Sequence, residues 1–555
     1  MPETMTQADN FWLCMDDPVN LMVITGFWEF KEPLDYNRLY ATVDIRLASF
    51  PRFRKKVVRP RSGLGLPKWV TDEHYDLGSH LHRVALPDPG DKHELSQMIS
   101  GLMTTALDPN KPLWDIHLIE NYGTGCALFF RLHHCIADGI ALMHVLHSAA
   151  DTDPDAPWPT PPEKGRPKKL RTSPLFSFDT MISSAKDLVQ KGQDISKKVF
   201  KEIEKASANP ASLKCMVKTA ANLPSDVAAV LSKHTIMSSD PNTAFKGRLG
   251  VQKQVTWTDP IPLDRIKTLG NAISSATLND VLIATVTGSM RRYLKTRNTP
   301  INELDLRVTV PVNIRKPGSE FELGNKFSLV FLSLPVFLED PILRLKEVKR
   351  RMDKLKSSAD PYVNFGLLSA IGFLPTTLAQ KAAQLFGNKA SGVLTNVPGP
   401  RQPLYFAGKE ITNIMFWVPR SGAIGLGISI LSYNGKVTIG IASDKGLMPD
   451  PETLLEGFEE EFNYLIDMVK SGKINEGPLV LHDRFAEKKL QKDNPKNQTP
   501  PVEVEPSQCE AYTKSKKKCR NKAMKGSCFC HRHRHHKEEG SLLSDVAQIM
   551  RDLAE

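Results

Sequence analysis

The sequence predicts a mixed α/β fold with more than one domain, and three observations support this prediction. The apolar run 126–132 has the length and aromatic content of a buried strand, and 140–146 has the apolar density of a buried helix. Strand-like segments return after residue 245. A chain of 555 residues is also long enough for two ordinary domains and additional material.

Composition favours a globular protein that acts inside the cell. Hydrophobic residues make up 41% of the chain, and the mean hydropathy is -0.29. The sequence contains no uncharged apolar run of the roughly 18 to 20 residues that a spanning helix needs. Residues 1–9 lack the basic and apolar regions of a secretory signal. We therefore expect a cytoplasmic location or peripheral attachment to a membrane or lipid body.

The net charge predicts attraction to an anionic partner. The formal charge is +11 and the isoelectric point is about 9.1. Phosphates of coenzyme A, anionic lipid and nucleic acid all fit this charge, which alone does not choose among them.

Residues 133–139, His-His-Cys-Ile-Ala-Asp-Gly, lie where the first predicted strand gives way to the predicted helix. Catalytic groups are often held at such junctions by a rigid scaffold. His134 and Asp138 are four residues apart, so a turn can fix the carboxylate beneath the strand end while the imidazole faces a cleft. The alternative is that His134 is an ordinary core or surface histidine without a catalytic role.

The segments that follow differ in character. Residues 153–174 are rich in proline and should be extended and exposed. Residues 178–235 read as helical, with apolar positions alternating with lysines. Such a stretch either packs its apolar stripe on the body of the protein or lies on an anionic membrane surface.

The second half of the chain returns to strands. The predicted strands are 307–315, 326–336, 392–396, 428–432 and 436–441. Asn434-Gly435 is a strong hairpin signal because both residues tolerate positive φ. The most apolar segment, 365–375, is too short to span a membrane; it fits a core helix, the wall of a lipid tunnel, or a membrane-surface segment equally well.

The histidine motif resembles the HHxxxDG signature of the acyl-CoA-dependent acyltransferases related to chloramphenicol acetyltransferase. The resemblance is closest to the bacterial wax ester synthase/diacylglycerol acyltransferases. Further segments are similar to that family and follow its order: Met15–Met22, Pro112–Trp114, Ala276–Val281, Arg307–Arg315, Leu323–Ser328, Thr395–Pro400 and Ser432–Lys436. The resemblance implies two chloramphenicol-acetyltransferase-like domains with a central cleft.

This resemblance and the composition together suggest how the chain is divided. The expected parts are an N-terminal acyltransferase domain at 1–152, a proline-rich and helical linker at 153–240, a C-terminal acyltransferase domain at 241–472, a flexible linker at 473–506, a small zinc-binding module at 507–537 and a C-terminal helix at 538–555.

The resemblance also implies roles for the site residues. His134 is the general base, and the acyl group passes directly from acyl-CoA, the co-substrate, to an alcohol. His133 shapes the site or binds substrate. Asp138 supports the loop, with Arg315 as a candidate partner. Asn279, from the second domain, hydrogen-bonds the oxyanion or orients the alcohol; a helix cap is the simpler interpretation of Asn279-Asp280.

Further residues are implied to bind substrate: Leu113, Trp114, Gly139 and Asp280. A buried tryptophan such as Trp114 is more often a core residue. The acyl acceptor implied is diacylglycerol or a long-chain alcohol. The alternatives are a condensation-domain-like acyltransferase and a lipid-binding protein of the same fold without activity.

The C-terminal tail contains a separate cluster of soft metal ligands. Cys509, Cys519, Cys530 and His533 form a Cys3His set suited to tetrahedral zinc, with Cys528, His531, His535 and His536 as alternative ligands. The other interpretation is a reduced, disordered basic tail. Its lysines and arginines are also compatible with anionic lipid, and nucleic acid is the weaker candidate.

Overall fold

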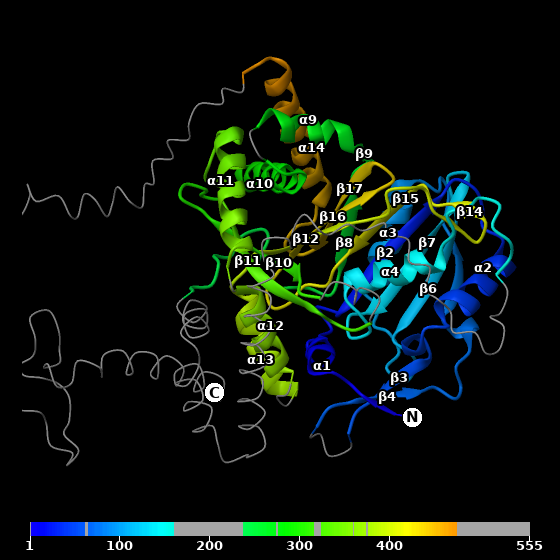
Figure 1. Cartoon of the computed structure of the whole chain (residues 1–555). Coiled ribbons are helices and arrows are strands. Elements are labelled where there is room, and N and C mark those ends of the chain that lie inside the picture. The colour runs from blue at the N-terminus through cyan, green and yellow to red at the C-terminus, as the bar shows by residue number, and fades with distance from the viewer. Residues whose placement is uncertain are drawn as a thin grey trace, which may run out of the picture.

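The computed structural model has a mixed α/β fold built around two large sheets, as predicted (Figure 1). It describes residues 2–60, 65–159, 237–273, 276–315, 323–358, 360–372 and 376–473. The expected helical segment 178–235 lies outside the described residues. So do the predicted zinc ligands Cys509, Cys519, Cys530 and His533.

The first large sheet has five strands in the order β15-β2-β7-β6-β5. Its strands are β2 (Val23–Phe30), β5 (Leu81–Ala85), β6 (Trp114–Tyr122), β7 (Gly125–His133) and β15 (Asn413–Trp417). β5 runs parallel to β6, and the other neighbours are antiparallel. The predicted strand 126–132 is β7, which is buried along its whole length at the centre of this sheet.

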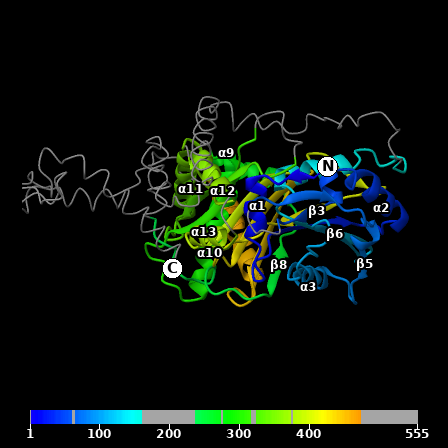
Figure 2. The ribbon, with the colours of Figure 1, turned by 90° about the horizontal axis from the view of Figure 1, so that it is seen from below.

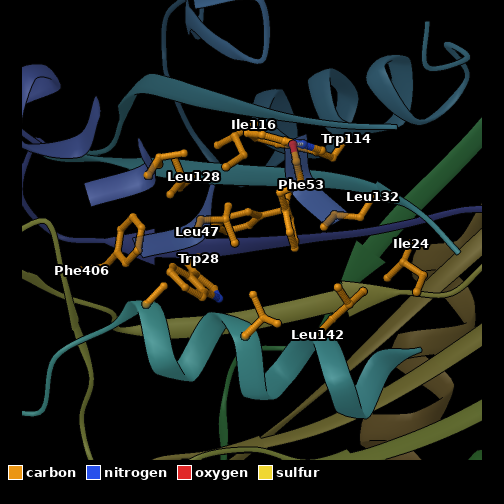
Figure 3. Close-up of a cluster of buried hydrophobic side chains, with 14 of the residues drawn as sticks. Ile24, Trp28, Leu47, Phe53, Trp114, Ile116, Leu128, Leu132, Leu142 and Phe406 are labelled. Carbon is orange, nitrogen blue, oxygen red and sulfur yellow. Dashed lines mark hydrogen bonds between the residues drawn. The ribbon is translucent and has the colours of Figure 1, made fainter. Parts of the chain in front are cut away.

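Helices cover both faces of the first sheet. The predicted helix 140–146 is α4 (Gly139–Ala149), whose Leu142 packs on the face that carries Trp28 and Leu128 (Figure 3). On the opposite face, α3 (Lys92–Met103) packs against Phe27 and Phe129. Side chains of a strand alternate between faces, so β7 supplies apolar residues to both layers and needs no polar face.

The second sheet has seven strands in the order β11-β10-β12-β16-β17-β8, with β9 beside β17. Its strands are β8 (Lys253–Trp257), β9 (Ile261–Pro262), β10 (Leu306–Asn313), β11 (Phe327–Leu334), β12 (Gly392–Pro398), β16 (Leu426–Tyr433) and β17 (Lys436–Asp444). All five strands predicted in the second half are present here. Asn434 and Gly435 join β16 to β17 with φ of 46° and 72°, which confirms the predicted hairpin.

One face of the second sheet carries four helices, which are α9 (Leu263–Ala272), α10 (Leu278–Thr296), α11 (Pro341–Lys356) and α14 (Pro451–Lys470). On the other face, α12 (Asp360–Ile371) and α13 (Thr376–Gly387) pack with α1 (Gln7–Cys14). Figure 2 shows α1 at the junction of the two units. Of the apolar segment 365–375, residues 365–371 therefore belong to a core helix, since Leu368 and Ile371 pack against Phe11 and Trp12.

β15 crosses between the two units. It lies within the expected C-terminal domain, 241–472, yet it pairs with β2, from Asn413 opposite Glu29 to Trp417 opposite Thr25. The chain then returns to the second sheet through β16. The two units are therefore joined by continuous ordered backbone.

Smaller elements complete the fold. They are the three-stranded sheet of β1 (Glu3–Thr4), β3 (Lys55–Val58) and β4 (Lys68–Thr71), the hairpin of β13 (Tyr405–Phe406) and β14 (Lys409–Glu410), α2 (Tyr36–Thr42), a π-helical turn at Val43–Leu47, and 3-10 turns at Pro51–Arg54 and Leu77–Ser79. Of the helices that are described, none combines the length and apolar character needed to cross a membrane.

Candidate active site

The junction at 133–139 joins the end of β7 to the start of α4, as predicted. Its backbone is anchored on both sides. The His134 N–H donates to the carbonyl oxygen of Met22 at 2.7 Å, and the His133 N–H donates to that of Leu113 at 2.9 Å. The two imidazoles therefore project from a fixed turn at the end of a fully buried strand.

The His134 ring lies between two aromatic side chains. Trp12 of α1 stacks on it with ring centroids 4.1 Å apart and an interplanar angle of 14°. Phe327, the first residue of β11, stacks with it at 5.4 Å. Because Phe327 belongs to the second sheet, the histidine sits where the two units meet.

Asn325 sets the tautomer of His134. The Nδ1 atom of His134 lies 2.9 Å from Asn325 Oδ1. The orientation of this amide is fixed because Asn325 Nδ2 donates to Asp9 Oδ1 and to the His134 carbonyl oxygen, each at 2.8 Å. Since Oδ1 can only accept, Nδ1 of His134 carries the proton and Nε2 keeps its lone pair. Nε2 is therefore the atom that can act as a base.

A buried ion pair between Asp9 and Arg52 holds Asn325 in place. Asp9, which is fully buried, also accepts from the Asn325 N–H at 2.9 Å. Its second oxygen accepts from Arg52 Nη1 at 3.0 Å, and Arg52 also donates to the carbonyl oxygen of Ile136 at 2.9 Å. Sequence reasoning did not identify Asp9, Arg52 or Asn325. Only the similarity of the segment 323–328 to the family pointed towards Asn325.

The surroundings of His134 keep its imidazole neutral. Burial lowers its pKa below the ordinary value of 6.5, while Asp138, Asn325 and Asp9 oppose this shift. A neutral imidazole near pH 7 is the form that accepts a proton. The same nearby negative charges stabilise the imidazolium that forms once it has done so.

His133 has a different environment. Its Nδ1 accepts a hydrogen bond from the Cys135 N–H at 3.1 Å, so this lone pair is already used. Its Nε2 lies 3.8 Å from Asp16. Burial, with smaller contributions from the neighbouring His134 and Arg59, lowers its pKa to about 3. This geometry suits a residue that holds the turn in place.

Asp138 connects α4 to the second unit. One of its oxygens accepts from the Ala141 N–H at 3.0 Å and so caps α4. The other accepts from the Lys326 N–H at 2.9 Å and forms an ion pair with Arg315. Arg315 also donates to the carbonyl oxygen of Gly324 at 2.6 Å. Arg315 is thus the partner suggested by the sequence, and Asp138 holds the segment that carries Asn325.

The first turn of α10 contains a capping box and, within it, the side-chain amide of Asn279. Thr277 is the N-cap, and Asp280 completes a capping box by accepting from the Thr277 N–H at 2.9 Å. Asp280, expected to bind substrate, is therefore placed as a capping residue. Half-buried Asn279 accepts at Oδ1 from Asn396 Nδ2 at 2.8 Å. This contact orients the Asn279 amide so that its Nδ2 donors point away from Asn396.

The strand register places Asn396, the partner of Asn279, at the end of the second sheet where Phe327 contacts His134. β10 and β12 run parallel with Thr309 opposite Val393, and β11 runs antiparallel to β10 with Asn313 opposite Phe327. Asn396 therefore lies beyond Val393 in the direction of Phe327, the residue that stacks on His134.

The remaining predicted site residues surround the motif. Leu113 and Trp114 are buried in the core of the first unit, and Trp114 Nε1 donates to the Phe53 carbonyl oxygen at 2.8 Å. The structure thus places them where they fix the strand ends. Gly139 opens α4, and a Cβ atom there would meet no atom within 4 Å among the described residues. Gly139 therefore leaves room beside the helix start.

Comparison with known proteins matches both halves of the chain. Residues 5–282 match the sequence model of the wax ester synthase/diacylglycerol acyltransferase catalytic domain, and residues 323–465 match that of the C-terminal domain. A probable diacylglycerol O-acyltransferase of Mycobacterium tuberculosis is 28% identical over 447 residues, covering 79% of this chain and 90% of that protein. The O-acyltransferase WSD of Acinetobacter baylyi is 28% identical over 410 residues, covering 71% and 82%.

Solved structures show the same fold. The wax ester synthase/diacylglycerol acyltransferase from Marinobacter aquaeolei has a TM-score of 0.58 at 22% identity, covering 84% of this chain and 100% of that one. The first condensation domain of the calcium-dependent antibiotic synthetase has a TM-score of 0.53 at 17% identity, covering 84% and 96%. The expected two-domain architecture is confirmed by these likenesses.

Proposed function

Because the chain belongs to the wax ester synthase/diacylglycerol acyltransferase family, we propose that it transfers a long-chain acyl group from acyl-CoA to a diacylglycerol or a fatty alcohol. The products are triacylglycerol or wax ester. The names of its relatives support this reaction. The observation that carries the mechanism is the hydrogen bond from His134 Nδ1 to Asn325 Oδ1, which leaves Nε2 as the base.

In this mechanism, Nε2 of His134 accepts the proton of the acceptor hydroxyl as its oxygen attacks the thioester carbonyl carbon. The C–S bond of the tetrahedral intermediate then breaks, and the CoA thiolate takes the proton from the imidazolium. No covalent acyl-enzyme forms. Burial of His134 between Trp12 and Phe327 keeps the ring neutral before attack and excludes water that would otherwise hydrolyse the thioester.

The other site residues act around this base. Asp138 is a positioning residue, since it ties α4 to the segment bearing Asn325. His133 holds the turn. Asn279 donates from Nδ2 to the oxyanion, an interaction worth about 3 kcal/mol in comparable sites. Its contact with Asn396 supports this role because the contact uses the oxygen and leaves the donors.

The remaining predicted residues contribute to substrate binding mainly by shaping the elements around the site. Leu113 and Trp114 act on substrate through the strand ends that they hold, and Asp280 acts through the start of α10 that it caps. Gly139 admits substrate beside α4. The net charge of +11 supports peripheral binding to an anionic membrane or lipid-body surface.

The tail is proposed to bind zinc through Cys509, Cys519, Cys530 and His533. This proposal rests on residue types and spacing alone. Zinc analysis of the full chain and its Cys519→Ser variant tests it, with loss of one bound zinc ion expected.

The activity is tested with the purified full chain, radiolabelled palmitoyl-CoA, and either diacylglycerol or hexadecanol. We expect labelled ester and stoichiometric CoA release, and we expect His134→Ala to abolish both. The matched control is His93→Ala, on the exposed surface of α3, which should retain activity. Ester formation that survives His134→Ala would refute the mechanism, and failure of the unmodified chain with both acceptors would refute the proposed reaction.

A further inference from the structure

Three side chains with metal-binding atoms meet on the α3 side of the first sheet. His82 of β5 and Asp115 and His117 of β6 each place one ligand atom within 4.8 Å of the others. His82 is the partner of His117 in the parallel β5–β6 pairing. Asp115 precedes His117 by two residues and so projects from the same face of the strand. Two regular strands therefore fix the spacing of the three groups.

Two atoms in this cluster are buried without a hydrogen-bond partner among the described residues. They are Asp115 Oδ1 and His117 Nδ1, which lie 3.6 Å apart. His117 is only 7% exposed. Leaving such buried groups unpaired destabilises the folded state. A cation bound between them would satisfy both atoms.

The other oxygen of Asp115 is already held. Arg131, opposite Asp115 on β7, donates to it from Nη1 at 3.0 Å. A partner of this kind behind a carboxylate ligand fixes its orientation, as is common around protein metal sites. Arg131 thereby directs Oδ1 towards the two imidazoles.

Burial shifts the pKa of both imidazoles in the same direction. Burial lowers the pKa of His117 to about 3, with smaller contributions from His82 and Arg131. Burial also lowers the pKa of His82.

We propose that His82, Asp115 and His117 bind a divalent transition-metal ion, with Zn²⁺ as the best fit. Two imidazoles and one carboxylate suit zinc, whereas Ca²⁺ and Mg²⁺ prefer oxygen ligands. With metal–ligand bonds of about 2.0–2.1 Å, modest side-chain rotations bring the ligand atoms together. His82 and Asp115 are only partly buried, which leaves a path for the ion and a water as fourth ligand.

The expected consequence is structural. β5 is an edge strand of the five-stranded sheet. A metal ion held by His82 on β5 and by two residues of β6 would cross-link this edge to its neighbour. The site uses none of the residues assigned to the acyltransfer chemistry and none of the predicted ligands in the tail.

The test measures metal binding by the full chain after removal of bound metal with a chelator. Co²⁺ is titrated as the spectroscopic probe, because cysteine ligands in the tail give thiolate charge-transfer bands and a His2Asp site does not. We expect His82→Ala to lose one equivalent of Co²⁺ and its d–d absorption while the thiolate bands stay unchanged. His93→Ala, also on the first unit, should bind as the unmodified chain does.

A second measurement distinguishes loss of the metal site from unfolding of the variant. Zn²⁺ should raise the unfolding temperature of the unmodified chain by more than that of His82→Ala, since binding to the folded state alone stabilises it. His82 is half-buried, so its replacement is milder than that of His117. Equal metal stoichiometry and an equal shift in unfolding temperature for His82→Ala and His93→Ala would overturn the proposal.

Discussion

The side chain of Asn325 accepts a hydrogen bond from Nδ1 of His134 and returns one from its own Nδ2 to the His134 backbone carbonyl oxygen. The amide therefore fixes both the orientation of the imidazole and its tautomer. Because Asn325 comes from the segment before β11, the second unit determines which nitrogen of a first-unit histidine is basic.

Replacing Asn325 should slow catalysis without weakening substrate binding. We expect Asn325→Ala to lower kcat by about 10- to 100-fold, by analogy with the loss of residues that orient metal-binding histidines. KM should change little because Asn325 faces the ring edge remote from Nε2. Initial rates of ester formation measure both parameters. Asn271→Ala, exposed on α9, is the control, and a purely KM effect at Asn325 would contradict this role.

The pH dependence should report on His134. Its pKa lies below 6.5 because of burial, so kcat/KM should rise with pH along a limb whose midpoint lies below pH 6.5. Asp9 raises this pKa, and Asp9→Asn should therefore move the rising limb to lower pH. Steady-state pH profiles of the two proteins make the comparison. A shift of the variant's limb to higher pH would show that Asp9 does not act on His134 electrostatically.

The local part of this site was predictable from sequence. The apolar run of β7, the polar turn and the apolar helix α4 follow one another directly, and Asp138 caps α4 with its own side chain. Such signals depend on a few adjacent residues. The same holds for the hairpin at Asn434 and Gly435, where positive φ is needed on both residues.

The supporting residues were not predictable in this way. Asn325 is 191 residues from His134 and 316 residues from Asp9 along the chain, so only tertiary packing brings them together. Asp280 is different, because Thr277 and Asp280 have the spacing of a capping box, which indicates a structural role from sequence alone. Trp114 likewise lies in a core, where large aromatic side chains are usually found.

The Asp138–Arg315 ion pair should contribute strongly to stability. Their side chains are 5% and 1% exposed, so Asp138→Asn removes the negative charge from a buried ion pair. We expect the free energy of unfolding to fall by about 3–5 kcal/mol. Urea denaturation measures the loss. The exposed pair Arg54–Asp44 offers the control, since Asp44→Asn should cost less than about 1 kcal/mol. Equal effects would mean that Asp138 does not stabilise the fold through this pair.

The contact between Asn279 and Asn396 predicts which of two substitutions slows the chemical step more. Asn279→Ala removes the proposed donor and should lower the single-turnover rate by about 100- to 1000-fold. Asn396→Ala keeps the donor but releases the amide that Asn396 orients, so its effect should be clearly smaller. Both variants should bind acyl-CoA with unchanged affinity, which equilibrium binding can establish. If Asn396→Ala were as damaging as Asn279→Ala, the contact itself rather than a free Nδ2 donor would be what the site requires. If neither variant slowed the chemical step, Asn279 would have only the structural role of beginning α10.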